Sequence, residues 1–380
     1  MKKEFSIYLD LVRFMAAVMV VIYHSNLRTV ITEKLPFSNH GHAAVIVFFV
    51  LSGYVISYIH STRETTPVEY WSSRLSRFYS LAIPAVLLCP LLDLAGEALA
   101  PQFYAGTTTH TLAGLRVVSS LLFLNEIYNL SIMSFSNVPY WSLCYEMWYY
   151  VLFAIVAFTR GNARIALMAV TILFLGPKIL ILAPLWILGA ALHRYQLLLR
   201  LPAWQYWLLF LASWPLYIAF QHFNMTEYGS QVLLRLLGER WHHEAAFSKF
   251  FIMDYPLALI IAANFIGFRG IAHHFSVPLL ACEKPIRWLS GYTFSLYILH
   301  QPLLQFFAAV FNGDPAGNLF YAEVIGATVL TIGVVGAFTE HKRHHMKAWI
   351  RSALYVMMAT RWWRQGVTAL LAPKQVAELR

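Results

Sequence analysis

The chain has 380 residues, of which 59% are hydrophobic, 16% aromatic and only 12% charged. A water-soluble globular protein needs more polar surface than this composition supplies, so that class is excluded and an integral membrane protein is indicated. The net charge of +10 requires no nucleic acid, because Lys and Arg gather in loops and in a basic C-terminal segment. Three scattered Cys residues predict neither a disulfide framework nor a zinc site.

Apolar runs long enough to cross a bilayer recur along nearly the whole chain and predict an all-α, polytopic transmembrane helical bundle. We expect ten spanning helices, at residues 5–27, 43–60, 78–99, 140–158, 164–179, 181–195, 204–222, 249–268, 291–311 and 320–339. The stretch 112–125 carries Arg116 and is predicted to be a short re-entrant or interfacial segment. Residues 1–340 then form one transmembrane domain.

The loops of this ten-span arrangement differ in charge. Counted through Arg343, one set of loops holds fourteen Lys and Arg residues and the other set holds seven. Because cytoplasmic loops carry the excess of positive charge, both termini are predicted to be cytoplasmic. Residues 341–380 form a basic tail, in which apolar and cationic residues alternate as in an amphipathic helix lying on anionic membrane lipids.

Span one carries Arg13 and His24 at the two ends of an apolar segment. At 3.6 residues per turn, these side chains fall within roughly 20° of one helix face and roughly 16 Å apart along the axis. A charged group at mid-membrane costs about 2.5–3.5 kcal/mol, so polar residues inside spans are candidates for function. The structural alternatives are an ion pair of Arg13 with Asp10 and a hydrogen-bonded packing role for His24.

Arg74 and Arg77 stand three residues apart, directly before span three. They share a helix face and present two planar guanidinium groups, a geometry suited to binding a polyphosphate. The alternative is that they bind no ligand and only contribute to the excess of positive charge in the cytoplasmic loops.

Two later spans also carry polar groups. Trp141, Ser142 and Glu146 lie near the outer end of span four, where a desolvated carboxyl group suits a proton acceptor or a group that orients an imidazole. The alternative for Glu146 is a protonated carboxyl group that bonds to a neighbouring helix. Tyr292 and His300 add polar groups to span nine.

These features occur in a fixed order and together resemble the acyltransferase 3 family of membrane acyltransferases, known mainly as O-acetyltransferases of bacterial surface sugars. The resemblance rests on five blocks: Arg13-x10-His24, the FFVLSGY sequence at 48–54, Arg74-x-x-Arg77 followed by Pro84, WSLxxE at 141–146, and SLYILHxP at 295–302. The family commonly has an acidic residue two positions before the double phenylalanine, where this chain has Ile46. His42 lies just upstream of that position.

The resemblance implies a cytoplasmic acyl-coenzyme A, most simply acetyl-coenzyme A, as donor, and a hydroxyl group on a carbohydrate, a glycolipid or another exported molecule as acceptor. It also implies the inner membrane of a bacterium. Arg13, Arg74 and Arg77 then face the cytoplasmic donor and bind its phosphates. A pantetheine arm threaded alongside span one brings the thioester toward His24.

The expected mechanism is general-base catalysis by His24, because the pKa of imidazole lies near the working pH. Glu146 is expected to orient the imidazole or relay its proton. A transient acyl-histidine is the alternative. The supporting or substrate-binding candidates are Trp141, Ser142, Tyr292, His300 and His42.

The outer loop at 223–249 is polar and aromatic and is expected to face the acceptor. It contains the adjacent His242 and His243, but neighbouring residues do not share a helix face, so no metal site is predicted. A competing hypothesis is a transporter or flippase that moves a sugar or lipid without acyl transfer, and a third is a non-catalytic membrane scaffold. Covalent incorporation of label from acetyl-coenzyme A discriminates the enzyme from both.

Overall fold

The computed structural model describes residues 1–27, 30–106, 111–195, 200–340 and 342–359. Within these ranges the chain is helical and forms no β-strand, which confirms the all-α prediction. The helices are α1 (Lys3–Ser25), α2 (Gly41–Thr62), α3 (Pro67–Leu99), α4 (Ala113–Leu121), α5 (Trp141–Phe158), α6 (Gly161–Leu175), α7 (Pro177–Arg194), α8 (Ala203–His222), α9 (Met225–Glu244), α10 (Phe251–Ile271), α11 (Ser276–Ala281), α12 (Glu283–Ser290), α13 (Thr293–Phe311), α14 (Asn318–Thr339) and α15 (Arg343–Ala359).

The predicted membrane spans all coincide with helices. Among the described residues, eight helical stretches are long and apolar enough to cross a bilayer, and they contain α1, α2, α3, α5, α7, α10, α13 and α14. The other two predicted spans form α6, a shorter apolar helix of 15 residues, and α8, which has 20 residues. The protein is therefore an integral membrane protein. The segment 112–125 forms α4, whose nine residues extend only about 14 Å, too short to cross.

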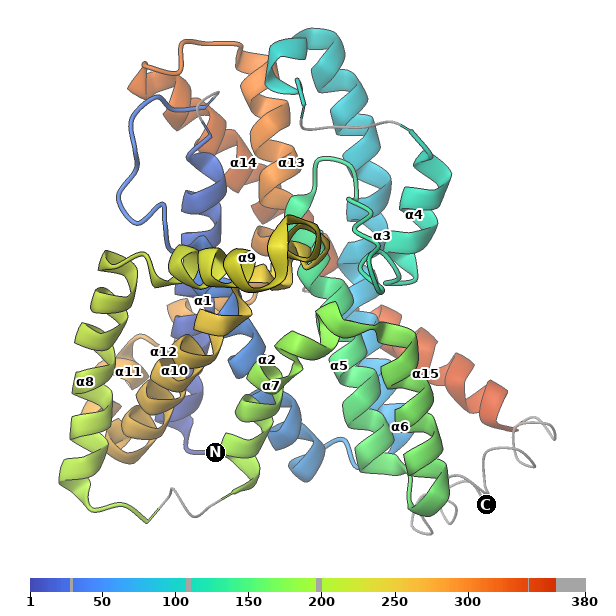
Figure 1. The fold of residues 1–380 in the computed structure, drawn as a ribbon, viewed down its shortest axis with the longest axis vertical. Coiled ribbons are helices and arrows are strands. Elements are labelled where there is room, and N and C mark those ends of the chain that lie inside the picture. Colours follow the sequence, from blue (N-terminus) through green and yellow to red (C-terminus); the bar gives the residue numbers. More distant parts are fainter. Residues whose placement is uncertain (28–29, 107–110, 196–199, 341, 360–380) are drawn as a thin grey trace.

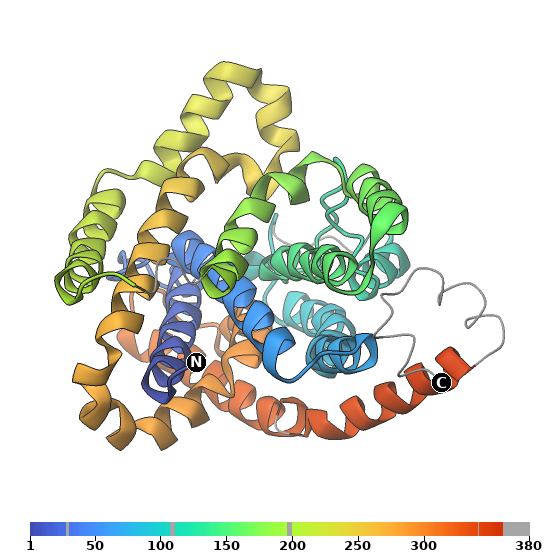
Figure 2. The ribbon, with the colours of Figure 1, turned by 90° about the horizontal axis from the view of Figure 1, so that it is seen from below.

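Figure 1 shows how these helices are arranged. α1 rises from the N-terminus at the lower end of the molecule, whereas the C-terminal end of α3 and the turn between α13 and α14 lie at the upper end. α9, part of the predicted outer loop, crosses the middle of the view and is kinked at Gly238, whereas α8 runs vertically at the left. Seen from below in Figure 2, α1 and α2 lie near the centre, with α8 and α15 at the periphery.

Helix α3 begins earlier than the sequence predicted. Thr66 caps it by accepting a hydrogen bond from the backbone N–H of Glu69 at 3.2 Å, and Pro67 occupies the first turn, where its missing N–H costs nothing. Arg74 and Arg77 therefore lie inside α3 rather than before it. The C-terminal tail contains α15, which packs along α3, and the residues after Ala359 lie outside the described part of the chain.

The connection from α4 to α5 is fixed by buried polar contacts. Lys178 Nζ lies 3.0 Å from Glu126 Oε2, and both side chains are almost fully buried. Asp93 of α3 accepts hydrogen bonds from the backbone N–H and the hydroxyl of Ser136, at 3.0 and 2.6 Å. Asn137 donates to the carbonyl of Ile298 in α13 at 2.9 Å. These contacts fix the point at which α5 begins.

Helices α2 and α7 pack backbone to backbone. A Cβ atom at Gly53 would overlap the carbonyl oxygen of Trp186, and one at Gly189 would overlap the carbonyl oxygen of Val50. Only glycine permits this approach, as at other close helix contacts in membranes.

We expect Gly189→Leu to lower the melting temperature of the detergent-solubilised protein, because overpacking costs about 1–3 kcal/mol even where backbone is not involved. Gly326→Leu in α14 is the matched control, since a Cβ at Gly326 meets no atom within 4 Å. Thermal unfolding followed by size-exclusion chromatography measures both. Equal melting temperatures for the two variants would show that α2 and α7 do not pack this closely.

Candidate active site

Arg13 and His24 open onto two different cavities along α1. The arginine cavity, of about 60 Å³, is lined by Arg13, Val45, Phe48, Phe49, Leu51, Ser52, Val55, Ile56, Arg77, Ser142, Leu143, Glu146, Tyr150, Thr293, Phe294 and Tyr297. The histidine cavity, of about 730 Å³, is lined by His24, His42 and Trp141, by residues of α8 and α9, and by the segment 246–250 that precedes α10. Val45 and Tyr297 line both cavities, so the two meet at these side chains.

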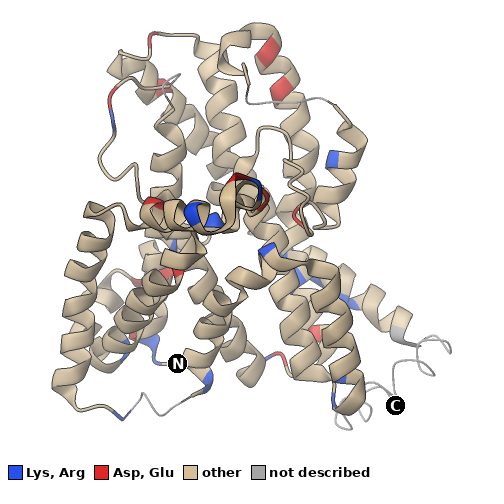
Figure 3. Ribbon diagram, in the orientation of Figure 1, with Lys and Arg blue, Asp and Glu red and all other residues tan. Residues whose placement is uncertain are grey.

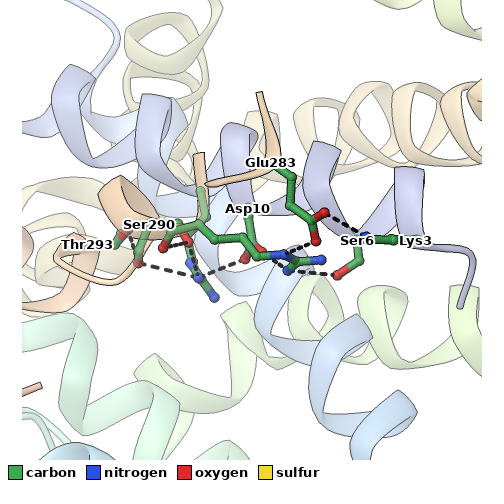
Figure 4. A network of polar contacts seen from close by, with 8 residues as sticks. Lys3, Ser6, Asp10, Glu283, Ser290 and Thr293 are labelled. Carbon is green, nitrogen blue, oxygen red and sulfur yellow. Dashed lines mark hydrogen bonds and ion pairs between the residues drawn. The ribbon is translucent and has the colours of Figure 1, made fainter. Parts of the chain in front are cut away.

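Arg13 contacts Ser290 of α12, and Figure 4 shows the polar network to which Asp10 and Ser290 belong. Its Nη2 atom lies 2.8 Å from Asp10 Oδ1 and 3.1 Å from Ser290 Oγ. The second Asp10 oxygen lies 2.8 Å from Nη1 of Arg287, which also contacts Glu283 at 3.0 Å. The ion pair with Asp10, the structural alternative for Arg13, is therefore present. Within the described residues, the buried Nε of Arg13 has no hydrogen-bond partner, which leaves donor capacity on a cation that lines the cavity.

The two arginines of α3 are not equivalent. Arg77 lines the arginine cavity, with its guanidinium carbon 5.7 Å from the centre of the Phe294 ring. Arg74 is buried, lies 2.5 Å from Glu64 and stacks 4.7 Å above Tyr70. The structure thus brings Arg77 and Arg13 to one cavity and places Arg74 in an internal ion pair.

Glu146 lies in the arginine cavity and not beside His24. Its Oε1 accepts hydrogen bonds from Ser52 and Tyr150, each at 2.5 Å. Trp186 donates to Ser52 at 3.1 Å and completes the cluster. The sequence-based expectation that Glu146 orients the imidazole of His24 therefore has no contact to support it.

His300 is the side chain that contacts His24. His300 Nδ1 lies 2.9 Å from the carbonyl of Leu296, and its Nε2 lies 3.0 Å from His24 Nδ1. A carbonyl oxygen only accepts, so His300 carries its proton on Nδ1 and its Nε2 accepts. His24 Nδ1, which also lies 3.0 Å from the carbonyl of Val20, is then the donor. In the neutral pair, Nε2 of His24 bears the free lone pair.

His42 also borders the histidine cavity. Its Nε2 lies 2.7 Å from Oδ1 of Asp254 on α10, whose side chain is fully buried. Sequence reasoning missed Asp254, although an acidic residue inside the predicted span 249–268 is a signal of the kind that selected Arg13. A carboxylate that accepts from an imidazole N–H leaves the other ring nitrogen to face a ligand.

The remaining candidates fall in different places. Trp141 lines the histidine cavity and stacks on Phe247 with ring centres 4.5 Å apart. Ser142 lines the arginine cavity, and its Oγ lies 2.7 Å from the hydroxyl of Tyr297. Tyr292 packs against Gly336 of α14 and borders neither of the two cavities. Tyr297 belongs to the SLYILHxP block, but the sequence alone did not mark it as a candidate site residue, because its position relative to the cavities depends on helix packing.

Comparison with known proteins adds an independent line of evidence. The profile of an acyltransferase-domain family, acyltransferase 3, matches residues 6–340. O-acetyltransferase OatA of Staphylococcus aureus (strain NCTC 8325 / PS 47) is 28% identical over 190 residues, covering 46% of this chain and 29% of the relative. Exopolysaccharide production protein ExoZ of Rhizobium meliloti (strain 1021) is 34% identical over 128 residues, covering 33% of this chain and 37% of the relative.

These matches span well under half the length of either relative. No solved structure is significantly similar to the chain. The family match extends over nearly the whole chain and includes both ends of the α1 site and the His300 segment. The chain belongs to the acyltransferase 3 family of membrane acyltransferases.

Proposed function

We propose that this protein transfers an acyl group, most simply acetyl, from acyl-coenzyme A to a hydroxyl group of a carbohydrate acceptor. The observation that carries the proposal is the pair of cavities along α1, one with two arginines and one with histidines, which meet at Val45 and Tyr297. A donor and an acceptor that enter from opposite ends would meet at that junction without the cofactor crossing the membrane.

The donor is assigned to the arginine cavity. Arg13 and Arg77 offer planar guanidinium groups, which bind phosphate through paired, charge-assisted hydrogen bonds. The cavity is narrow and otherwise mostly apolar, which suits a thin pantetheine arm better than the nucleotide. Binding the phosphates therefore belongs at its mouth, with the thioester directed toward Tyr297.

The proposed orientation places the lower end of Figure 1 in the cytoplasm of a bacterial inner membrane. Figure 3 shows Lys and Arg at the lower ends of the helices and mainly Asp and Glu at the upper end. This distribution agrees with the excess of positive charge that cytoplasmic loops carry. The donor cations then lie on the side where acyl-coenzyme A is made.

The acceptor is assigned to the histidine cavity. Its volume of about 730 Å³ is in the range of small-ligand sites, and its lining combines Trp141 with polar side chains such as Gln221, Glu227 and His42. The names of the two relatives, an O-acetyltransferase and an exopolysaccharide production protein, support a hydroxyl group on a carbohydrate. The covalent step would therefore form an ester.

His24 acts as the general base in this proposal. Its Nε2 removes the proton from the acceptor hydroxyl as that oxygen attacks the thioester carbonyl carbon. The carbon–sulfur bond then breaks, and the proton passes from His24 to the departing thiolate, so His24 ends unchanged. His300 acts through Nδ1 of His24, because it fixes the tautomer that leaves Nε2 free. Proton transfer of this kind usually contributes about 10²- to 10⁴-fold to the rate.

We expect His24→Ala to abolish acyl transfer while the protein stays folded and binds acetyl-coenzyme A. The measurement is mass spectrometry of envelope and secreted glycans from cells that carry the wild type, the variant or no gene, with loss of an acetyl increment as the readout. His222→Ala, at an exposed position of α8, is the matched control. Undiminished acetylation by His24→Ala would remove this imidazole from the mechanism, and transport of an unmodified substrate by the wild type would favour a flippase.

We expect Arg77→Ala to weaken acetyl-coenzyme A binding by roughly 10- to 100-fold, the loss of one charged hydrogen bond worth about 1.5–3 kcal/mol. Arg74→Ala should instead lower the melting temperature, because it leaves the buried Glu64 without its partner. Arg240→Ala on α9, an exposed arginine, controls for the loss of one positive charge. Binding to purified protein is measured calorimetrically, and wild-type affinity in Arg77→Ala would contradict the donor site.

A further inference from the structure

We propose that Tyr297 is a catalytic residue whose phenolic hydroxyl stabilises the negative charge that develops on the thioester carbonyl oxygen. The inference rests on the proposed function and adds to it the group that binds this oxygen. The inference depends on the position of Tyr297. Two residues line both cavities, Val45 and Tyr297, and of these only Tyr297 has a polar side chain.

The junction is where the reaction must take place. The thioester enters through the arginine cavity and the acceptor hydroxyl through the histidine cavity, so the carbon that bonds to both lies where the cavities meet. Tyr297 and His300 are three residues apart on α13 and therefore share a helix face. On this face, His300 forms a hydrogen bond with His24, and Tyr297 borders the junction of the cavities.

The hydroxyl group of Tyr297 is held in place from one side. It lies 2.7 Å from Ser142 Oγ and 3.4 Å from the carbonyl of Pro139, and Ser142 Oγ lies 3.1 Å from the same carbonyl. The ring is buried and contacts Phe48 edge to face, with centres 5.4 Å apart. The phenol is thus fixed without an ionised partner, and Ser142 is able to donate to it when the phenolic proton turns toward an oxyanion.

The other hydroxyl groups lining the arginine cavity are already bound to acceptors. Ser52 and Tyr150 both donate to Glu146, and Thr293 donates to the carbonyl of Ser290. Arg13 lies about 16 Å along α1 from His24, and its Nη2 is bound to Asp10 and Ser290. Tyr297 is the neutral donor that combines a position at the junction with a hydroxyl partner able to change from acceptor to donor.

The acyl transfer needs no reactant besides the thioester and the acceptor hydroxyl. Attack of the acceptor oxygen moves the carbonyl π electrons onto oxygen, and Tyr297 donates a hydrogen bond to that oxygen while keeping its proton. When the carbon–sulfur bond breaks, the electrons return to re-form the carbonyl and the charge leaves on sulfur. A fixed donor helps because its hydrogen bond strengthens only as the charge develops.

The test compares three variants in inverted membrane vesicles, so that added radiolabelled acetyl-coenzyme A reaches the cytoplasmic face, with label in envelope glycan as the readout. We expect Tyr297→Phe to lower kcat by about 10²- to 10³-fold, the usual effect of removing one oxyanion donor, with little change in acetyl-coenzyme A affinity or melting temperature. Ser142→Ala should lower kcat by about 10-fold or less, because the phenol remains.

Tyr145→Phe is the matched control, since it removes another buried phenolic hydroxyl, bonded to Ser248, that borders neither of the two cavities. It should transfer label at the wild-type rate. Equal losses in Tyr297→Phe and Ser142→Ala would mean that the hydroxyl serves only to bind Ser142, and a wild-type kcat in Tyr297→Phe would equally overturn the inference. If wild-type vesicles transfer no label at all, the proposed function fails instead.

Discussion

Polar contacts join helix α1 to the segment formed by α12 and α13, and the site depends on two of them. Arg13 binds Ser290 near the middle of α1, and His24 binds His300 about 16 Å further along the helix axis. Polar side chains inside a membrane must be satisfied within the protein, because lipid offers no hydrogen bonds. The two contacts thus fix the register of α1 against its neighbours, and with it the direction in which both side chains face.

This register keeps the proposed phosphate-binding cations apart from the imidazole proposed as the base, two kinds of group that would interfere with each other in one cavity. Arg13 and Arg77 line the cavity at one end, and the imidazole pair of His24 and His300 lies at the other. A guanidinium group beside the imidazole would oppose its protonation, whereas roughly 16 Å of apolar helix keeps the two apart. Tyr297 lies between them and carries no formal charge, as suits a group that borders both cavities.

Sequence reasoning went furthest where the residues share one helix. The all-α bundle follows from apolar length, and the pairing of Asp10 with Arg13, the structural alternative for that arginine, follows from their spacing on one helix; the structure contains both. Predictions from the sequence were less successful for contacts between two different segments. Glu146 was expected beside His24 but bonds to Ser52, and the expected pair of phosphate-binding arginines in α3 is divided by an ion pair with Glu64.

Composition, apolar length and motif order are enough to identify a membrane-embedded helical protein, the spans that carry polar groups, and the family that the chain resembles. Those properties depend on local periodicity and on the cost of polar atoms in lipid. Three features depend on helix packing and could not be predicted: His300 is the partner of His24, Asp254 is the partner of His42, and Tyr297 borders both cavities. Such pairs lie hundreds of residues apart, and helix packing, not helical periodicity, brings them together.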